Sequence, residues 1–402
     1  MNMTSHKEIS ICVIDYALAG SFFLRLAASD KDREYIFVST LLSTYLAARK
    51  KHEAYLISKV SKVQEKDKVT SLPVNRVREL GLNILQHENA MEFASVLQSS
   101  IRKILDKNKN KKVNLLTWNG DNVIGAVMRQ AKQADNTVSL LFFELSNLKG
   151  KIFVDPEGVN AASSVYLKPE VLQNIPSVDE GIHDVWLKDF FEEKKGNKLL
   201  PQASKGKEIT LRHLIDFVYT KFWGFQTFPK SSISNRIRKK RTHEINDDKV
   251  IPDEYIFFPM QVSTDTQIVL NSDVDNVDVL NHLIEKEILP IVTKPHPAES
   301  NFDYIYKIKN ENQGRLFISQ KNTYELIKNA KCVYTINSTV GMESMLFDKS
   351  VVFMGRSVYS NMGTAELKKY LHNYLVDIDF FDENFTITPN LIDSVYSRRN
   401  DG

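Results

Sequence analysis

Short apolar runs alternate with helical stretches along the first half of the chain. The runs EISICVI, EYIFVST, AYLIS, VNLLTW and VSLLFFE have the length and the β-branched or aromatic content of buried strands. Stretches with helical spacing lie between several of them, for example residues 89–105 and 122–134. Strands that alternate with helices predict a parallel sheet covered on both faces.

The second half repeats this alternation more regularly. EYIFFPMQV, ILPIVTK, RLFIS, CVYTI and SVVFMG predict strands, and helical patterns lie between them at residues 277–284, 304–310, 323–329 and 340–347. Successive β–α–β units predict right-handed crossovers and a Rossmann-like domain. The tail, residues 366–399, has a largely helical pattern and is expected to pack back across the first domain.

Strand signals disappear between the two halves, where charge blocks surround one apolar helix, ITLRHLIDFVYTKFWGF. A linker or a helical insertion between two domains is the interpretation. We therefore expect an N-terminal Rossmann-like domain at residues 1–190, the linker or insertion at 191–250, a C-terminal Rossmann-like domain at 251–365 and C-terminal helices that cross back at 366–402.

The composition is that of an ordinary globular protein, and it excludes several classes. The 402 residues allow two or three domains, and a formal net charge of +3 is too small to indicate a nucleic-acid partner. No apolar run reaches the roughly 18–20 residues of a membrane span. The two cysteines, Cys12 and Cys332, fall in predicted strands and are expected to be buried reduced thiols, which suits the cytosol.

Polar clusters follow four of the predicted strands in the second half, where ligands bind in open α/β sheets. In QVSTDTQI, alternate residues Gln261, Ser263, Asp265 and Gln267 can line one side of an extended segment. The alternative is a polar loop in which Asp265 caps a helix or forms a turn.

The stretch KPHP places Lys294 and His296 two residues apart, with a proline on each side of His296 that stiffens the backbone, so both side chains are expected to point the same way. Two donors on one side suit a phosphate group. The alternative is a strand that ends at a proline, with a solvated lysine. Arg356 follows the last strand in MGRS; a surface arginine is its default interpretation, and a phosphate or carboxylate contact is the alternative.

The segment NSTVGMES opens a predicted helix directly after a strand. Asn337, Ser338 and Thr339 bring hydroxyls and backbone N–H groups to a helix N-terminus, which is an anion site. The alternative is a helix cap without a ligand. Gly341 permits close backbone approach, and Glu343 is better placed to accept hydrogen bonds from a ribose than to hold a phosphate.

Neither a Walker motif nor a G-x-G-x-x-G motif occurs in the sequence, which weakens the ATPase and dehydrogenase interpretations. Asp273 with Asp275, and Asp377 with Asp379, have the spacing of metal motifs. The first pair is expected to start a helix and the second to end a strand, so no metal site is predicted.

The first half holds three further clusters. Trp118 and Asn119 in TWNGDN can stack on a sugar and hydrogen-bond to it, or can form a simple turn. Glu144 follows two phenylalanines in FFELSN, where a raised pKa would suit a general acid or base; the alternative is a carboxylate in water at a strand end. The segment DPEGVNAASS offers Asn160, Ser163 and Ser164 after a turn.

The order FFE, DPEGVNAASS, PMQVSTDTQ, KPHP and INSTVGMES resembles the bacterial capsule-polysaccharide and O-antigen β-Kdo transferases, over about residues 10–360. Kdo is 3-deoxy-D-manno-oct-2-ulosonic acid. The resemblance implies a GT-B-like α/β fold in which an N-terminal acceptor domain and a C-terminal nucleotide-sugar domain, both Rossmann-like, face a cleft. It also implies CMP-β-Kdo as the donor, a lipid-linked or oligosaccharide glycan as the acceptor, retention of the β configuration, and neither a cofactor nor a divalent metal. The segment LSNLKG after Glu144 departs from the glycine- and proline-containing turn that the family leads one to expect.

The resemblance also implies roles for single residues. Asp265 is expected to be the nucleophile of a double displacement, Glu144 the base that deprotonates the acceptor, and His296 a phosphate contact. Front-face attack is the alternative route, and which carboxylate matters more stays open. The donor-binding residues are expected to be Lys294, His296, Asn337, Ser338, Thr339, Gly341, Glu343, Gln261, Gln267 and Arg356. The acceptor-binding residues are expected to be Trp118, Asn119, Asn160, Ser163 and Ser164.

Two other functions fit the same clusters. A sialyltransferase-like enzyme also uses a CMP-sugar with a carboxylate on its anomeric carbon, and a non-catalytic glycan-binding or assembly subunit would keep the fold without turnover. The basic run Arg236, Arg238, Lys239, Lys240 and Arg241 is either a solvated linker or a segment attracted to anionic lipid. The expected localisation is cytoplasmic, with peripheral contact at the inner face of the inner membrane as the refinement.

Overall fold

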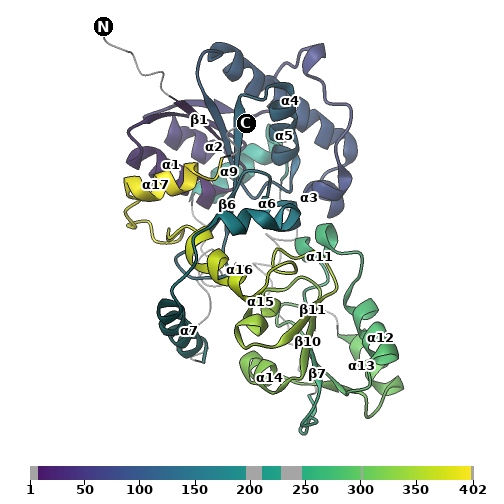
Figure 1. Cartoon of the computed structure of the whole chain (residues 1–402). Coiled ribbons are helices and arrows are strands. Elements are labelled where there is room, and N and C mark those ends of the chain that lie inside the picture. The colour runs from purple at the N-terminus through teal and green to yellow at the C-terminus, as the bar shows by residue number, and fades with distance from the viewer. Residues whose placement is uncertain (1–7, 196–210, 228–246, 300–301, 400–402) are drawn as a thin grey trace. The chain divides into compact units, whose positions relative to one another are not determined.

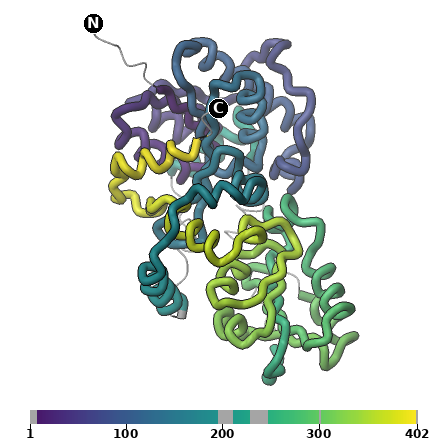
Figure 2. Tube along the Cα trace, in the orientation of Figure 1, coloured from purple at the N-terminus to yellow at the C-terminus, as the bar shows by residue number. Residues whose placement is uncertain are grey.

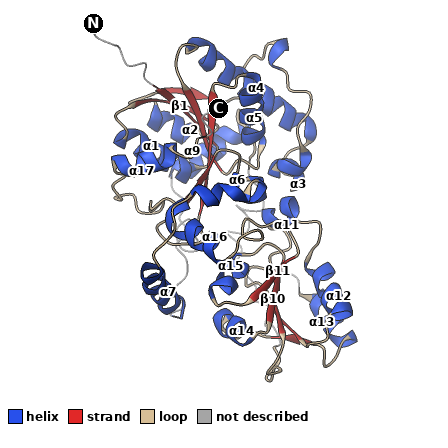
Figure 3. Cartoon of the chain, in the orientation of Figure 1, coloured by secondary structure: helices blue, strands red, loops and turns tan. Residues whose placement is uncertain are grey.

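The computed structural model describes residues 8–195, 211–227, 247–299 and 302–399, which form two compact units (Figure 1). The first unit comprises residues 1–164, 199–237 and 374–402, and the second comprises residues 165–198 and 238–373. Each unit is built on its own sheet, with helices around it (Figure 3). The chain is therefore α/β with two Rossmann-like units, as the alternation of strands and helices predicts.

The sheet of the first unit has six strands in the order β3-β2-β1-β4-β5-β6. The strands are β1 (Glu8–Ile14), β2 (Arg33–Ser39), β3 (Glu53–Leu56), β4 (Val113–Trp118), β5 (Val138–Leu145) and β6 (Ile152–Asp155). The first five are parallel, and β6 pairs antiparallel with β5 at the edge. β1, β4 and β5 are buried along most of their length, as strands covered on both faces are.

Seven helices and three 3₁₀ turns accompany this sheet in the described part of the first unit. They are α1 (Ala17–Ser29), α2 (Leu42–Ala48), η1 (Glu65–Asp67), η2 (Val74–Arg76), α3 (Arg78–Gly81), α4 (His87–Lys107), α5 (Val123–Ala134), η3 (Asn160–Ala162), α9 (Leu211–Phe222) and α17 (Pro389–Tyr396). The short helix α6 (Ser164–Leu167) lies at the boundary with the second unit.

The sheet of the second unit has five parallel strands in the order β11-β10-β7-β8-β9. Its strands are β7 (Ile256–Pro259), β8 (Ile291–Lys294), β9 (Leu316–Ile318), β10 (Cys332–Thr335) and β11 (Ser350–Phe353). Its helices are η4 (Pro169–Asn174), α7 (Glu180–Lys195), α11 (Thr266–Asn271), α12 (Asn276–Lys286), α13 (Asp303–Glu311), α14 (Thr323–Asn329), α15 (Thr339–Leu346), α16 (Thr364–Lys369) and a π-helical turn at Tyr370–Tyr374.

Alternate residues of β7 belong to two different apolar cores. Ile256 and Phe258 pack in one buried cluster with residues of α12 and α13, such as Leu280 and Ile305. Phe257 packs in another cluster, with residues of α14. Both faces of the sheet are therefore covered, and the ends of its strands are the places where polar groups can gather.

The C-terminal segment completes the core of the first unit. Val376 pairs with Ile152 in an antiparallel bridge, and Ile378 and Val395 are buried in one cluster with Phe143. Figure 2 shows this yellow segment lying with the purple and blue elements of the first unit. The predicted return of a C-terminal helix onto the first domain is confirmed.

The tail is less helical than its sequence pattern predicts. It is helical at 364–374 and 389–396, whereas residues 375–388 are extended or turn. Val376 exchanges backbone hydrogen bonds with Ile152, which takes this stretch out of a helix. Pro389 then opens α17 at a position where its missing N–H costs nothing.

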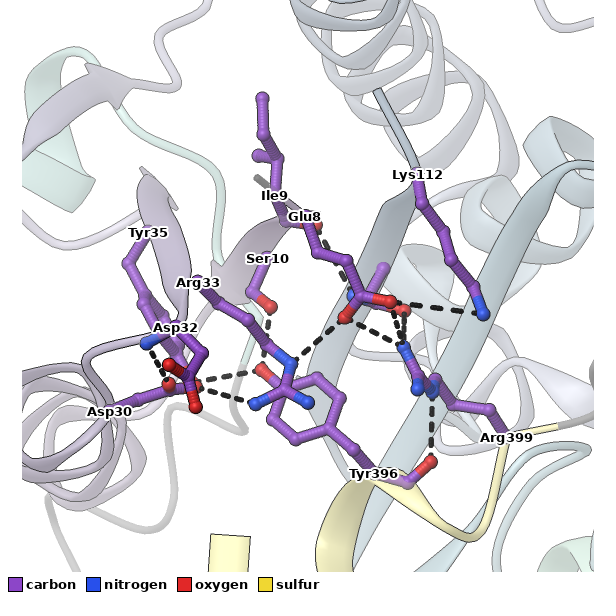
Figure 4. A network of polar contacts seen from close by, with 11 residues as sticks. Glu8, Ile9, Ser10, Asp30, Asp32, Arg33, Tyr35, Lys112, Tyr396 and Arg399 are labelled. Carbon is purple, nitrogen blue, oxygen red and sulfur yellow. Dashed lines mark hydrogen bonds and ion pairs between the residues drawn. The ribbon is translucent and has the colours of Figure 1, made fainter. Parts of the chain in front are cut away.

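A polar network also fixes α17 against the first sheet (Figure 4). The hydroxyl of Tyr396 lies 2.5 Å from Ser10 Oγ and 2.9 Å from the hydroxyl of Tyr35. Arg399 Nη1 donates to both carboxylate oxygens of Glu8 at 2.9 Å. Burial raises the pKa of Tyr396, so its hydroxyl stays neutral and available as a hydrogen-bonding group.

The structure bears on two expectations, one about the cysteines and one about membrane-spanning helices. Cys12 and Cys332 are free cysteines, the first buried and the second half-buried. Among the described helices, none combines the length and apolar character that crossing a membrane requires.

Truncation of Ile378 should show that the C-terminal segment belongs to the first unit's core. Ile378 is fully buried, so Ile378→Ala removes apolar contacts and leaves a cavity. We expect the free energy of unfolding to fall by about 2–5 kcal/mol, measured by urea denaturation. Ile288→Ala is the matched control, because Ile288 is 90% exposed. An equal effect of the two substitutions would contradict this role of the tail.

Candidate functional site

The polar segments after β7 and β10 are joined by a buried pair of amides. Gln261 Nε2 donates to Asn337 Oδ1 at 2.9 Å, and the backbone N–H of Asn337 donates to Gln261 Oε1 at 3.0 Å. Both side chains are buried. β7 and β10 are neighbours, so parallel pairing brings the two segments to the same sheet edge. Because a buried amide without partners is costly, this pair fixes the geometry of the edge.

Helix α11 and the start of α12 are tied to the same pair. Asn337 Nδ2 donates to the carbonyl of Gln267 at 2.8 Å, and Asn271 Nδ2 donates to Gln267 Oε1 at 3.0 Å. On the other side, Asn276 Nδ2 donates to the carbonyl of Gln261 at 2.8 Å. Gln261, Gln267 and Asn337, three of the residues predicted to bind the donor, therefore lie together and hold the loop between β7 and α11. Their role in donor binding stays a prediction.

Asp265 is the N-cap residue of α11. Its Oδ1 accepts a hydrogen bond from the backbone N–H of Gln267 at 2.8 Å, and its side chain is half-buried. The structure thus realises the capping alternative that the sequence left open. A cap fixes the carboxylate at the carboxyl edge of the sheet, and the nucleophilic role of Asp265 stays a prediction.

The loop that contains His296 is braced against the loop that precedes Asp265. Glu299 Oε2 accepts hydrogen bonds from the backbone N–H and from the hydroxyl of Ser263, both at 2.8 Å. His296 is exposed, and its Nδ1 accepts from the backbone N–H of Ala298 at 3.0 Å. In the neutral imidazole an accepting Nδ1 places the proton on Nε2, which makes Nε2 a donor.

Lys294 is held at the start of α14. Its Nζ donates to the carbonyl of Lys321 at 2.6 Å and to Thr323 Oγ1 at 3.2 Å. Burial of this half-buried side chain lowers the pKa of Lys294. Two of the three hydrogens of the ammonium group thus have acceptors within the chain, and the predicted phosphate contact would use the third.

Helix α15 begins at the predicted position, with Ser338 as its N-cap. Ser338 Oγ accepts from the backbone N–H of Val340 at 3.2 Å, and Thr339 is half-buried in the first turn. A Cβ on Gly341 would lie 2.4 Å from a ring carbon of Phe353. The structure therefore explains Gly341 by the close packing of α15 on β11, without the approach of a ligand.

Glu343 forms an ion pair that the sequence did not predict. Its buried carboxylate accepts from Lys194 Nζ of α7 at 2.9 Å. The hydroxyl of Tyr324 lies near this carboxylate without forming a hydrogen bond to it. Burial and the charge of Glu343 raise the pKa of Tyr324. Glu343 therefore already has a cationic partner where the resemblance implies a ribose contact.

Arg356 pairs with a carboxylate of the chain itself. Its Nη1 donates to Asp273 Oδ2 at 2.7 Å, and its backbone N–H donates to the carbonyl of Asn271 at 2.8 Å. Both charged groups are partly exposed. Asp275, two residues after Asp273, caps α12, as expected for a helix start.

At the carboxyl edge of the first sheet, Glu144 and Asn119 come together. Asn119 Nδ2 donates to Glu144 Oε2 at 2.7 Å, and the backbone N–H of Leu145 donates to Oε1 at 2.9 Å. Asn119 and Gly120 have positive φ values of 71° and 115°, which turn the chain sharply after β4. Burial raises the pKa of Glu144, in the direction that its apolar strand predicts.

Among the buried carboxyl groups of the first unit, Asp15, Glu79 and Asp121 were not among the predicted site residues. Asp15 follows β1, Asp121 follows β4, and Glu79 lies in α3. Arg78 Nη2 lies 3.3 Å from Glu79 Oε1 and 3.5 Å from Asp15 Oδ2. Burial raises the pKa of Glu79 to about 7 and that of Asp121 to about 6.

Among the described residues, no group of three or more His, Cys, Asp or Glu is arranged to hold a metal ion.

The sequence carried a signal for only some of these groups. Asp15 and Asp121 directly follow apolar strands, so the strand-end rule that selected Glu144 applies to them too. Arg78 and Glu79 lie on a single helical turn and have no such pattern.

Trp118 lies in the core of the first unit, not at an open edge. Its side chain is buried, and its ring centre lies 4.2 Å from that of Phe380. The structure thus gives Trp118 a packing role in place of the predicted stacking on a sugar.

The serines predicted for the acceptor are also buried. Ser164 Oγ donates to Asp155 Oδ2 at 2.6 Å, and Asp155 also accepts from the hydroxyl of Tyr374 at 2.9 Å. Ser163 Oγ donates to the carbonyl of Asn160 at 2.6 Å, and Asn160 itself has a positive φ of 51°. These contacts give the two serines a part in shaping the turn after β6.

The predicted basic run at 236–241 lies outside the described residues.

Comparison with known proteins finds a family model that matches part of the chain. Residues 208–375 match the family model described as capsule polysaccharide biosynthesis protein. Each of the two units is built on a sheet of mainly parallel strands.

Two curated relatives share part of the chain. Protein FixF of Sinorhizobium fredii (strain NBRC 101917 / NGR234) is 24% identical over 273 residues, which are 66% of this chain and 54% of that protein. Capsule polysaccharide export protein KpsS of Escherichia coli is 26% identical over 158 residues, which are 34% of this chain and 40% of that protein. The chain thus spans about half the length of the curated relatives it matches.

Solved structures also resemble the chain. Thermosulfurimonas dismutans KpsC, beta Kdo 2,7 transferase, is 16% identical with a TM-score of 0.41, covering 74% of this chain and 88% of that one. A glycosyltransferase from Rickettsia africae is 12% identical with a TM-score of 0.30, covering 98% and 94% of the two chains.

The raised pKa of Glu79 should make stability depend on pH. The folded state keeps a proton that the unfolded chain releases between pH 4.5 and about 7, so stability falls as the pH rises through this window. In Glu79→Gln this loss is absent, and we expect the decrease between pH 5 and pH 8 to be smaller than in the wild type by about 2–3 kcal/mol. Urea denaturation at four pH values measures the difference.

Asp106→Asn is the control for loss of a carboxylate, because the side chain of Asp106 is 52% exposed. If the free energy of unfolding depended on pH equally in Glu79→Gln and the wild type, the raised pKa of Glu79 would be contradicted.

Proposed function

We propose that the chain transfers Kdo from CMP-β-Kdo to a glycan acceptor, with retention of the β configuration, in the synthesis of a capsule or O-antigen polysaccharide. The match of residues 208–375 to the family model described as capsule polysaccharide biosynthesis protein supports the process. The observation that carries the proposal is the carboxyl edge of the second sheet. There, Gln261, Asn337 and the helix-capping Asp265 are linked through Gln267 into one hydrogen-bonded group, built from the segments on which the resemblance to β-Kdo transferases rests.

The proposed reaction has two displacements. The carboxylate of Asp265 attacks the anomeric carbon of Kdo, the bond from that carbon to the CMP phosphate oxygen breaks, and CMP leaves. Glu144 then takes the proton of an acceptor hydroxyl, whose oxygen displaces the Asp265 carboxylate from the same carbon. Two inversions give net retention. The raised pKa of Glu144 suits a base that works near neutral pH.

Stabilisation of the departing phosphate is proposed to come from the chain itself, without a metal cofactor. His296 would contact the phosphate through Nε2, because its Nδ1 accepts from Ala298. Lys294 has an ammonium hydrogen beyond its two internal acceptors, and α15 begins with N–H groups beside Ser338. Donors that are already fixed need little reorganisation when the charge develops. The Asn337–Gln261 pair fixes the segment that precedes α15 and is not assigned a step.

A non-catalytic assembly or export role is the second candidate. One matched relative is named a capsule polysaccharide export protein, and Asp265 already serves as a helix cap in this structure. Incubation of the purified chain with CMP-Kdo and a synthetic glycan acceptor separates the two candidates. Transfer of Kdo to the acceptor supports the enzyme. CMP binding without transfer or hydrolysis supports the non-catalytic role, and use of CMP-sialic acid in place of CMP-Kdo would contradict the proposed donor.

Asp265→Asn tests the proposed nucleophile. Asparagine caps a helix as well as aspartate does, so the variant should fold, whereas the amide cannot form the glycosyl ester. We expect transfer to fall by roughly 10³-fold or more while CMP still binds. The measurements are product formation and calorimetric titration with CMP.

Asp275→Asn provides the matched control, because Asp275 is also an N-cap aspartate of the second unit. This variant should retain transfer. Retained transfer in Asp265→Asn would remove that residue from the nucleophilic role.

His296→Ala tests the phosphate contact. Removal of a donor to a charged phosphate should weaken CMP binding by about 1.5–3 kcal/mol, or roughly 10- to 150-fold. His282→Ala serves as the control, because His282 is an exposed histidine on α12 of the same unit. If the two variants bind CMP with the same affinity as the wild type, His296 does not contact the phosphate.

A further inference from the structure

Helix α9 presents an apolar face to solvent. Residues at 211, 214, 218 and 222 follow helical spacing, and such a stripe normally faces a core. Here the large apolar residues of the helix and its end are 42–72% exposed: Leu211, Leu214, Phe217, Val218, Phe222 and Trp223. A contiguous group of this kind, unlike scattered single residues, indicates an interaction surface.

The opposite side of α9 is fixed to the first unit. Asp216 accepts from the backbone N–H of Ser43 at 2.7 Å and from its hydroxyl at 2.6 Å. The hydroxyl of Tyr219 donates to the carbonyl of Ile57 at 2.7 Å. Asp216 and Tyr219 are buried, so the outward direction of the apolar face follows from specific contacts. α2, which carries Ser43, lies beside α9 (Figure 1) and adds Leu46, 47% exposed.

The segments around this face carry mainly positive charge. Residues 42–62 and 211–227 contain seven exposed basic side chains: Arg49, Lys50, Lys51, Lys59, Lys62, Arg212 and Lys221. The same two ranges contain only two acidic residues, Asp216 and Glu53. Asp216 is buried against Ser43, and Glu53 accepts from Lys107 at 2.8 Å. The surroundings of the apolar face are therefore strongly cationic.

We propose that the α9 face, defined as Leu46, Leu211, Leu214, Phe217, Val218, Phe222 and Trp223, docks on a lipid bilayer that contains anionic lipids. Leucine, phenylalanine and tryptophan side chains enter the boundary between headgroups and acyl chains, while the surrounding lysines and arginines meet the negative headgroups. Long basic side chains can reach the headgroups while their stems lie on apolar surface. A second copy of the chain fits this face poorly, because pairing it with itself would bring seven cations against seven. This proposal does not rest on the transferase activity proposed above.

Vesicle sedimentation with the full chain tests the surface. The probes are phosphatidylcholine vesicles and vesicles with 30% phosphatidylglycerol. We expect binding to the anionic vesicles, weakened by high salt, and little binding to the neutral ones. The variant L214S/F217S/F222S should lower the partition coefficient at least tenfold, and K59E/K221E should lower it about tenfold or more at low salt. All five positions are exposed, so both variants should unfold at the wild-type temperature.

The matched control is I182S/V185S, which removes two residues that are 63% and 65% exposed on α7 of the second unit. It should bind anionic vesicles as the wild type does. The proposal is overturned if the wild type ignores anionic vesicles, if the triple variant binds as well as the wild type, or if the α7 control loses as much binding. Light scattering that shows a dimer dispersed by the triple variant, without vesicle binding, would assign the face to a second copy instead.

Discussion

Both sheets are covered by apolar side chains on both faces, and this single constraint decides where polar chemistry can appear. A buried parallel strand satisfies its peptide groups through its neighbours and offers no open side to a polar group. The strand ends are therefore the main places where polar side chains gather. The Gln261–Asn337 pair after β7 and β10 and the Asn119–Glu144 pair at the ends of β4 and β5 are two results of the same rule.

Close packing makes these strand ends rigid. A Cβ on Gly125 would lie 1.9 Å from the carbonyl oxygen of Gly120, so the first turn of α5 can approach the turn after β4 only with glycine there. Gly341 has the same function in α15, where the ring of Phe353 occupies the space. The loops at the two edges are thus placed by contacts that leave no room for adjustment. Rigid placement of donors is what stabilisation of a developing charge requires.

The sequence was sufficient for the parts of the fold that depend on local patterns. The ten predicted strands are all present, because long apolar runs between helical stretches have few other solutions. β6 was not predicted, because its four residues are followed by a proline and a glycine, which indicate a turn. Its pairing also involves Val376, a residue distant in sequence. At the site, the helix starts at Ser338 and Asp275 were predictable from capping chemistry. Periodicity could not tell that the stripe of α9 faces solvent, since the same spacing describes a buried helix.

Contacts between residues distant in sequence could not be predicted, because local patterns carry no information about them. One of these contacts bears on the predicted donor site. Lys194 and Glu343 are 149 positions apart, and their ion pair is largely buried. Removal of one partner from such a pair leaves a buried charge, at a cost of about 3–5 kcal/mol. Ribose hydroxyls are neutral and cannot replace the ammonium group in this balance. A ribose can therefore use the second carboxylate oxygen of Glu343 only while Lys194 stays on the first. The two contacts are compatible in that arrangement, and the ribose contact predicted for Glu343 would then place α7 beside the nucleotide.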